Sequence, residues 1–383
     1  MIAVSLSVSA AASSTALSSE RGPPPLNLRV SAETRALLVP IDAPNYREAK
    51  LDSLFKQLRD RGDAYCSMVH AFDGAERDRS VATRYLRQGP QFRRYWRACP
   101  NCPGNVRLGC WNYYRTNDRD IDVMFETVKK FSGFEAPQCF SVGLTQPYEM
   151  HNRLGCSTLT IVDYSWRIQD AHRQVLDKVR AGRFVDEKSV NRALRDVVIG
   201  WSHRKDATLP SFQARLEDLC GVREGRRACA QRFVEFQRGW AQLKRVELFL
   251  GSLHEVPIQE DSQSKVLFFS NAMDRRYTSD PEIESMLTRL TKSLQPQQEI
   301  VLVHHAAGSG RFGIYSLSKS ADGMTLTARC RDEYPSPPKV GTSPTYTISL
   351  DDRIDNLGEA PPCSATASDR VGSDIAHTER QGR

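Results

Sequence analysis

The order of predicted elements in residues 265–331 constrains the fold more than any other stretch of the chain. Its hydrophobic pattern predicts a strand over 266–270, a helix over 281–294, a strand over 299–305 and a β-hairpin over 311–318 and 324–331. Asp280 and Pro281 suit a helix start, because Asp caps free N–H groups and proline loses nothing at the first helical position. Two apolar strands joined by a helix favour a parallel sheet, which the hairpin then ends with antiparallel strands.

The same alternation of strands and helices runs upstream. Helices are predicted over 120–131 and 166–181, a short helix or a turn over 147–154, and strands over 138–144 and 157–162. Asp118 or Asp120 can cap the first of these helices. Strands at 36–41, 64–72 and 106–115 and a helix at 45–61 are also expected. The chain is therefore predicted to be an α/β protein with a mainly parallel three-layer sheet that ends in an antiparallel hairpin.

Residues 183–264 interrupt this rhythm, since their pattern is helical and poor in strand signal. We expect a helical insertion or cap over 183–264, between two parts of the α/β domain at 35–182 and 265–345. Residues 1–34 are expected to be a disordered tail or a leader, and residues 346–383 a disordered tail.

The targeting signals in the chain are weak. The first 19 residues carry no charge, but they lack the basic start and continuous apolar core of a signal peptide, so a disordered tail is favoured over a leader. No apolar run is long enough for a membrane-spanning helix. Ten cysteines permit disulfides or free thiols. A cytoplasmic location is favoured, while secretion or organelle targeting stays open.

A glycine and an aspartate follow two successive predicted strands. Gly143 lies in the turn after the strand over 138–144, and Asp163 follows the strand over 157–162. A carboxylate at the end of a parallel strand can accept hydrogen bonds from both hydroxyls of a ribose. The alternative, which the sequence alone favours, is that Asp163 caps the following helix.

With this element order, the chain resembles the class I S-adenosylmethionine-dependent methyltransferases. The resemblance implies that S-adenosylmethionine lies near Gly143 and Asp163 and gives its methyl group to an acceptor that the sequence does not identify. The turn over 143–147 departs from the family pattern, because it has one glycine where two or three are usual, and it contains a proline. The family often places substrate-facing polar groups after the strand over 266–270, a position held here by Asn271. Its alternative role is an ordinary strand-to-helix loop.

Two adjacent histidines and a glycine-rich stretch follow the strand over 299–305. Residues 308–313 match G-x-G-x-x-G, but the next segment alternates like a strand, so a hairpin turn is expected in place of a phosphate site. Neighbouring residues on a strand face opposite sides, so His304 and His305 are not expected to share a metal. Either can act as a general base, and His304 is the candidate; a structural role is the alternative.

Three cysteines have partial zinc-site spacing. Cys99 and Cys102 form a C-x2-C pair, and Cys110 offers a third thiolate. A second pair is absent, so zinc, a disulfide among these residues and unlinked thiols all stay open.

Residues 84–115 combine seven arginines with aromatic side chains and contain no acidic residue, in a chain of net charge +7. Arginines that pair with phosphates and aromatics that stack on bases are typical of single-stranded nucleic-acid binding, for which Arg93, Arg94, Trp96 and Arg97 are candidates. The alternative is that the aromatics pack in the core. The runner-up function is therefore a non-catalytic nucleic-acid or anion-binding protein, and a third is an exported, disulfide-bonded α/β protein.

Overall fold

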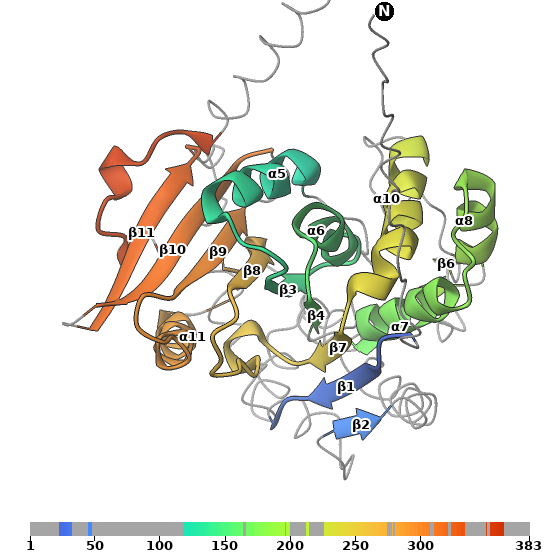
Figure 1. Ribbon diagram of the computed structural model, residues 1–383, viewed down its shortest axis with the longest axis horizontal. Coiled ribbons are helices and arrows are strands. Elements are labelled where there is room, and N and C mark those ends of the chain that lie inside the picture. Colours follow the sequence, from blue (N-terminus) through green and yellow to red (C-terminus); the bar gives the residue numbers. More distant parts are fainter. Residues whose placement is uncertain are drawn as a thin grey trace, which may run out of the picture.

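The computed structural model describes residues 23–32, 45–47, 118, 120–163, 166–195, 197–199, 212–213, 226–273, 278, 280–306, 310–320, 323–333, 350 and 353–363 of the 383-residue chain. In these residues a nine-stranded mixed sheet forms the centre of the fold, and helices pack against it (Figure 1).

The sheet has the strand order β11-β10-β9-β8-β3-β4-β7-β1-β2. Its strands are β1 (Leu26–Val30), β2 (Asn45–Arg47), β3 (Gln138–Val142), β4 (Thr158–Asp163), β7 (Arg245–Leu250), β8 (Lys265–Ser270), β9 (Glu299–His305), β10 (Phe312–Ser320) and β11 (Gly323–Arg331). The six strands from β9 to β1 pair in parallel, whereas β2, β10 and β11 pair antiparallel to their neighbours. A separate ribbon pairs β5 (Val198–Ile199) with β6 (Phe212–Gln213). The sheet is thus mostly parallel and ends in the antiparallel hairpin that the sequence predicts.

Local capping residues define the ends of several helices. They are α5 (Ile121–Ser132), α6 (Gln146–Leu154), α7 (Trp166–Arg180), α8 (Glu187–Leu194), α10 (Arg226–Gly239) and α11 (Asp280–Lys292), with short 3-10 turns η3 (Trp240–Gln242), η4 (Leu253–Glu255), η5 (Asn271–Met273) and η7 (Leu357–Glu359). At α8, Asp186 and Ser189 form a reciprocal capping box. At the end of α6, Gly155 takes a left-handed conformation with φ of 62°, which glycine adopts without steric cost.

Strand β8 packs on both of its faces, because successive side chains point to opposite sides. On β8, Val266 and Phe268 join the apolar cluster that contains α5, α6, α7 and α10. Leu267 and Phe269 join a second cluster formed with α11 and Val256. Figure 1 shows α5 and α6 on one side of the sheet and α11 on the other.

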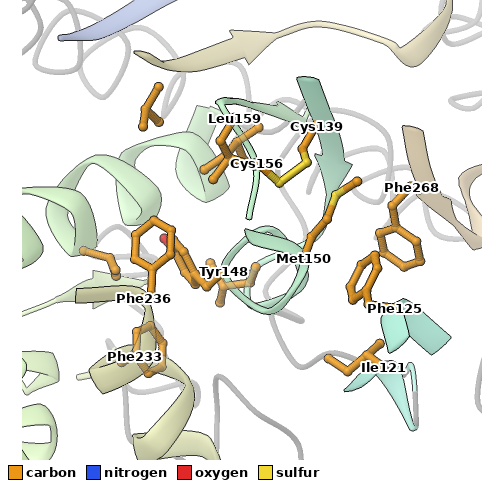
Figure 2. Close-up of a cluster of buried hydrophobic side chains, with 14 of the residues drawn as sticks. Ile121, Phe125, Cys139, Tyr148, Met150, Cys156, Leu159, Phe233, Phe236 and Phe268 are labelled. Atoms are coloured by element: carbon orange, nitrogen blue, oxygen red, sulfur yellow. A yellow bond between two sulfur atoms is a disulfide. The ribbon is translucent and has the colours of Figure 1, made fainter. Parts of the chain in front are cut away.

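Aromatic rings fill much of the first cluster, as Figure 2 shows. Phe125 of α5 meets Phe268 of β8 edge to face, with ring centroids 5.3 Å apart. Tyr148 of α6 packs against Phe233 and Phe236 of α10. Such pairs add about 1 kcal/mol each beyond the area they bury. The cluster therefore fixes α6, which follows β3, against both neighbouring helices.

Most predicted elements of the described residues are confirmed within a residue or two. They are the helices predicted at 120–131, 147–154, 166–181 and 281–294 and the strands predicted at 138–144, 157–162, 266–270, 299–305, 311–318 and 324–331. The strands at 36–41, 64–72 and 106–115 lie outside the described residues. Strong periodicity and clear helix starts explain this agreement.

Three boundaries differ from the sequence prediction. Strand β1 lies inside the predicted tail or leader, and strand β7 lies inside the predicted helical insertion. Arg29 of β1 and Glu247 of β7 form an ion pair across these strands, 3.2 Å apart. Both strands were missed because a charged residue interrupts each short apolar run. The predicted helix over 45–61 begins instead as β2, and its remainder lies outside the described residues.

The segment over 353–363, placed in the predicted C-terminal tail, covers the outer edge of β11. The side chain of Asn356 accepts a hydrogen bond from Ala328 N–H and donates one to Ala328 O, like a neighbouring strand. Arg331 N–H donates to Pro361 O, and a disulfide joins Cys330 to Cys363. The edge of the sheet is therefore closed by the chain itself.

Every cysteine in the described part of the chain is disulfide-bonded. Cys139 at the start of β3 pairs with Cys156 just before β4, and Cys229 of α10 is also bonded. No described helix has the length and apolar content that crossing a membrane requires.

Candidate functional site

The carboxyl ends of β3, β4, β8 and β9 meet at one edge of the sheet, because these strands are parallel neighbours. The chain passes from β3 to β4 and β7 on one side, then returns to β8 and β9 on the other side of β3. The strand order therefore reverses at β3. Ligands of open α/β sheets bind outside the carboxyl ends of the strands at such a point.

Gly143 occupies the turn between β3 and α6 in a conformation that requires glycine. Its φ is 89°, and a Cβ at this position would collide with the side-chain amide of Gln146. Gln146 Oε1 accepts a hydrogen bond from Thr145 N–H at 3.0 Å. The N-terminus of α6 thus donates this N–H to a side chain of the same helix. A phosphate-binding turn would instead leave its N–H groups free for a ligand.

Asp163 ends β4, one strand away from Gly143. Its backbone carbonyl accepts a hydrogen bond from Gly251 N–H at 2.9 Å, and its side chain is half-buried. The two residues that the sequence predicts near a cofactor therefore lie at the ends of adjacent parallel strands.

A buried carboxylate joins three of the strand-end segments. Asp118 Oδ2 accepts hydrogen bonds from Ser270 Oγ at 2.7 Å and from Gln146 Nε2 at 2.9 Å. Asp118 Oδ1 lies 3.2 Å from His305 Nδ1, and both side chains are fully buried. We call Asp118, Gln146, Ser270 and His305 the Asp118 cluster. It connects the helix after β3 with the ends of β8 and β9.

The contacts of the Asp118 cluster favour an ionised carboxylate. Burial by itself raises the pKa of Asp118, but the charge of His305 and hydrogen bonds from His305, Ser270 and Gln146 lower it below the ordinary value. An ionised carboxylate only accepts hydrogen bonds, which matches the two donors seen at Oδ2.

The backbone around the Asp118 cluster is unusual. Ser270 and Asp120 have φ of 48° and 55°, in the left-handed region that non-glycine residues rarely adopt. A Cβ at Gly310 would collide with the Asp120 carboxylate, so the segment before β10 packs closely on this residue. Asp120 is the N-cap residue of α5, as one of the two predicted alternatives has it, but its side chain makes no capping hydrogen bond, and Asp118 belongs to the cluster instead.

A second polar pair supports the Gly143 turn from α7. His172 Nε2 lies 3.0 Å from Gly143 O, and a carbonyl can only accept, so this nitrogen carries the proton. His172 Nδ1 then accepts from the Tyr148 hydroxyl at 2.7 Å. Burial lowers the pKa of His172 to about 4 and raises that of Tyr148 well above its ordinary value. Both groups are therefore neutral at pH 7 and act as fixed supports.

The other predicted site residues fall in different places. Asn271 begins η5 directly after Ser270. His304 is buried in β9, and strand alternation places it on the α11 side, opposite His305. The predicted zinc ligands and nucleic-acid contacts lie outside the described residues; they are Cys99, Cys102, Cys110, Arg93, Arg94, Trp96 and Arg97. Among the described residues, no group of three or more His, Cys, Asp or Glu side chains could hold a metal.

Sequence reasoning missed most of the Asp118 cluster. The sequence analysis names His304 as the candidate base and leaves His305 as the other possibility. The apolar residues on the same face of β9 as His305, Val301 and Val303, indicate the side to which His305 points. Ser270 and Asp118 carry no such signal, because they lie 152 residues apart and meet only in the folded sheet.

Comparison with known proteins does not identify a family for the chain. No protein family model matches the chain, and the search of curated proteins gave no match.

Proposed function

We propose that the chain is a methyltransferase-like protein with a three-layer, Rossmann-like architecture that binds S-adenosylmethionine at the carboxyl edge of its sheet. The observation that carries this proposal is the strand order β7-β4-β3-β8-β9, which reverses at β3 and puts Gly143 and Asp163 at the ends of neighbouring parallel strands. The carboxylate of Asp163 would accept hydrogen bonds from the ribose hydroxyls, and the Gly143 turn would lie beside the cofactor.

The chemistry of the edge supports a cofactor without phosphates. Thr145 N–H at the start of α6 already donates to Gln146, whose side-chain amide in turn donates to the buried Asp118. This N–H is therefore not offered to a phosphate, as binding of a dinucleotide would require. S-adenosylmethionine has a ribose and no phosphate, so it fits this donor pattern.

The bound cofactor would supply an electrophilic methyl group. The residues of the chain would hold the acceptor in line with that group, since orientation is the main contribution a protein can make to such a displacement. The Asp118 cluster fixes the turn at Ser270, and this positions Asn271 at the start of η5. Asn271 would orient the acceptor, and His304 is the proposed base.

The disulfides favour one further feature of the function. Each described cysteine is oxidised, and disulfides persist in secreted and other oxidising environments. We therefore also propose that the chain folds in an oxidising compartment, in keeping with the exported reading of the sequence. Thiol titration in denaturant should find the five described cysteines unreactive before reduction, and free thiols at full stoichiometry would overturn this proposal.

Isothermal titration calorimetry with S-adenosylmethionine and S-adenosylhomocysteine tests the cofactor proposal. The wild-type protein should bind both, and Asp163→Asn should weaken both by about tenfold or more, since it removes the acceptor of the ribose hydroxyls. Asp177→Asn, a change on the exposed face of α7, is the matched control and should leave binding unchanged. If neither ligand binds the wild-type protein at millimolar concentration, the methyltransferase proposal is wrong.

A further inference from the structure

A short segment without strand structure covers the outer edge of β11, the last strand of the sheet (Figure 1). We call this segment, residues 353–363, the strap. Its Asn356 side chain accepts a hydrogen bond from Ala328 N–H at 2.8 Å and donates one to Ala328 O at 3.1 Å. Asp355 N–H donates to Leu326 O at 3.1 Å. The strap therefore takes the hydrogen bonds that a further strand would make with the middle of β11.

The strap is fastened by one covalent bond and by weaker contacts. The disulfide between Cys330 and Cys363 attaches its end to β11 and closes a loop with a sequence separation of 33. Ile354 joins the apolar cluster on the α11 side of the sheet. Arg353 pairs with Glu284 of α11, but both side chains reach solvent, and exposed ion pairs add little stability. The position of the strap therefore depends mainly on the disulfide.

The edge beneath the strap is suited to strand pairing. β11 is nine residues long, and among the described residues it has a strand neighbour on one side only. Its Leu326 and Ala328 side chains are buried in the same apolar cluster as Ile354 of the strap. An uncovered edge of this kind offers a row of backbone N–H and C=O groups to any strand that can pair with it.

We infer that the strap keeps the chain from associating with a second copy of itself through the β11 edge. When the strap is unfastened, the β11 strands of two copies pair antiparallel about Thr327, and the two sheets become continuous. The inference concerns a different part of the sheet from the cofactor site and does not depend on the proposed function.

A second copy is the partner that the register of β11 favours. Leu326 O and both backbone groups of Ala328 point outward, so Leu326 of one copy can form a hydrogen-bonded pair with Ala328 of the other. This register places the two-fold axis at Thr327 and satisfies both copies in the same way. Arg329 then lies opposite Thr325, so that no like charges meet across the axis.

Sedimentation velocity of the full chain over a range of protein concentrations tests the inference. The variant Cys330→Ala, Cys363→Ala unfastens the strap and should form a dimer of the wild-type species as the concentration is raised. Asn356→Leu keeps the disulfide and removes the two hydrogen bonds to Ala328, so it should associate more weakly. The variant Cys139→Ala, Cys156→Ala is the matched control, because it removes a disulfide away from β11, and it should sediment like wild type.

A substitution at the proposed axis tests the register. Thr327→Lys, added to the variant without the Cys330–Cys363 disulfide, places two like charges directly opposite each other and should dissociate the dimer. Thr327→Val is its control, because valine also suits a strand and brings no charge, so the dimer should persist.

Two results would overturn the inference. One is a variant without the Cys330–Cys363 disulfide that is folded by circular dichroism and sediments like wild type at every concentration. The other is association that survives Thr327→Lys, since the contact would then lie elsewhere. If the disulfide variant does not fold, Asn356→Leu decides by the same two criteria, because its disulfide is intact.

Discussion

At the amino edge of β3 and β8 a buried lysine holds a loop in place, whereas at the carboxyl edge of the same strands a buried aspartate connects three loops. Lys265 is 1% exposed, and its Nζ donates to Asp261 Oδ1 at 2.9 Å and to the backbone carbonyls of Asp261 and Gln263 at 3.2 and 3.1 Å. All three protons of the ammonium group are therefore satisfied.

The two clusters differ in charge and in covalent closure. The amino edge pairs a cation with an anion, and the disulfide between Cys139 and Cys156 locks the adjoining ends of β3 and β4. The carboxyl edge pairs the carboxylate of Asp118 with the ring of His305, 3.2 Å away. The comparison teaches that polar groups of similar burial connect different parts of the chain: Lys265 holds one loop at the start of β8, whereas Asp118 joins segments at the ends of β3, β8 and β9.

The largest expected effect comes from removing the disulfide between Cys139 and Cys156 at the amino edge. Replacing Cys139 and Cys156 by alanine releases a loop of 17 residues and should lower the free energy of unfolding by about 3 kcal/mol. Urea denaturation measures the change. Replacement of Cys330 and Cys363, at the far edge of the sheet, is the comparison variant. Unchanged stability of the Cys139 and Cys156 variant would show that packing alone holds this edge.

The next effect concerns the pH dependence of the free energy of unfolding, which comes from His172 beside the Gly143 turn. The pKa of His172 is about 4 in the folded protein and 6.5 as its ordinary value, so the unfolded state binds a proton more readily. The stability contribution is complete above about pH 6.5 and is lost as the pH falls toward 4, by roughly 3 kcal/mol in total.

Denaturation of wild type and His172→Gln between pH 7.5 and 4.5 measures this effect. Glutamine can accept from Tyr148 and donate to Gly143 O, so the variant should fold and show a flatter pH dependence. Parallel curves for the two proteins would contradict a buried neutral His172.

A smaller effect is expected from Lys265→Met at the amino edge. The methionine fills the space of the lysine stem, while Asp261, whose side chain is 35% exposed, can be hydrated. Loss of the three hydrogen bonds should cost about 2 kcal/mol in urea denaturation. The affinity for S-adenosylmethionine should not change, in contrast to Asp163→Asn. A change in that affinity on Lys265→Met would mean that the two edges are coupled.

Several elements could be predicted because their signals are local. The helix α11 follows from its Asp-Pro start and the spacing of Ile283, Met286, Leu287 and Leu290. The hairpin of β10 and β11 follows from alternation along the chain. Strands β1 and β7 were missed because a short run such as 245–250, interrupted by Glu247, shows too few residues for its period to be read.

The sequence by itself determined most of the helices and strands between residues 120 and 331 and the buried face of each, because burial of one face leaves a period in the chain. Only the tertiary structure decided that β7 and β4 lie on one side of β3 and β8 and β9 on the other. It also brought Asp118 to Ser270 and His305. Contacts between such distant residues depend on the way in which the long loops between them close. No local period in the sequence indicates such contacts.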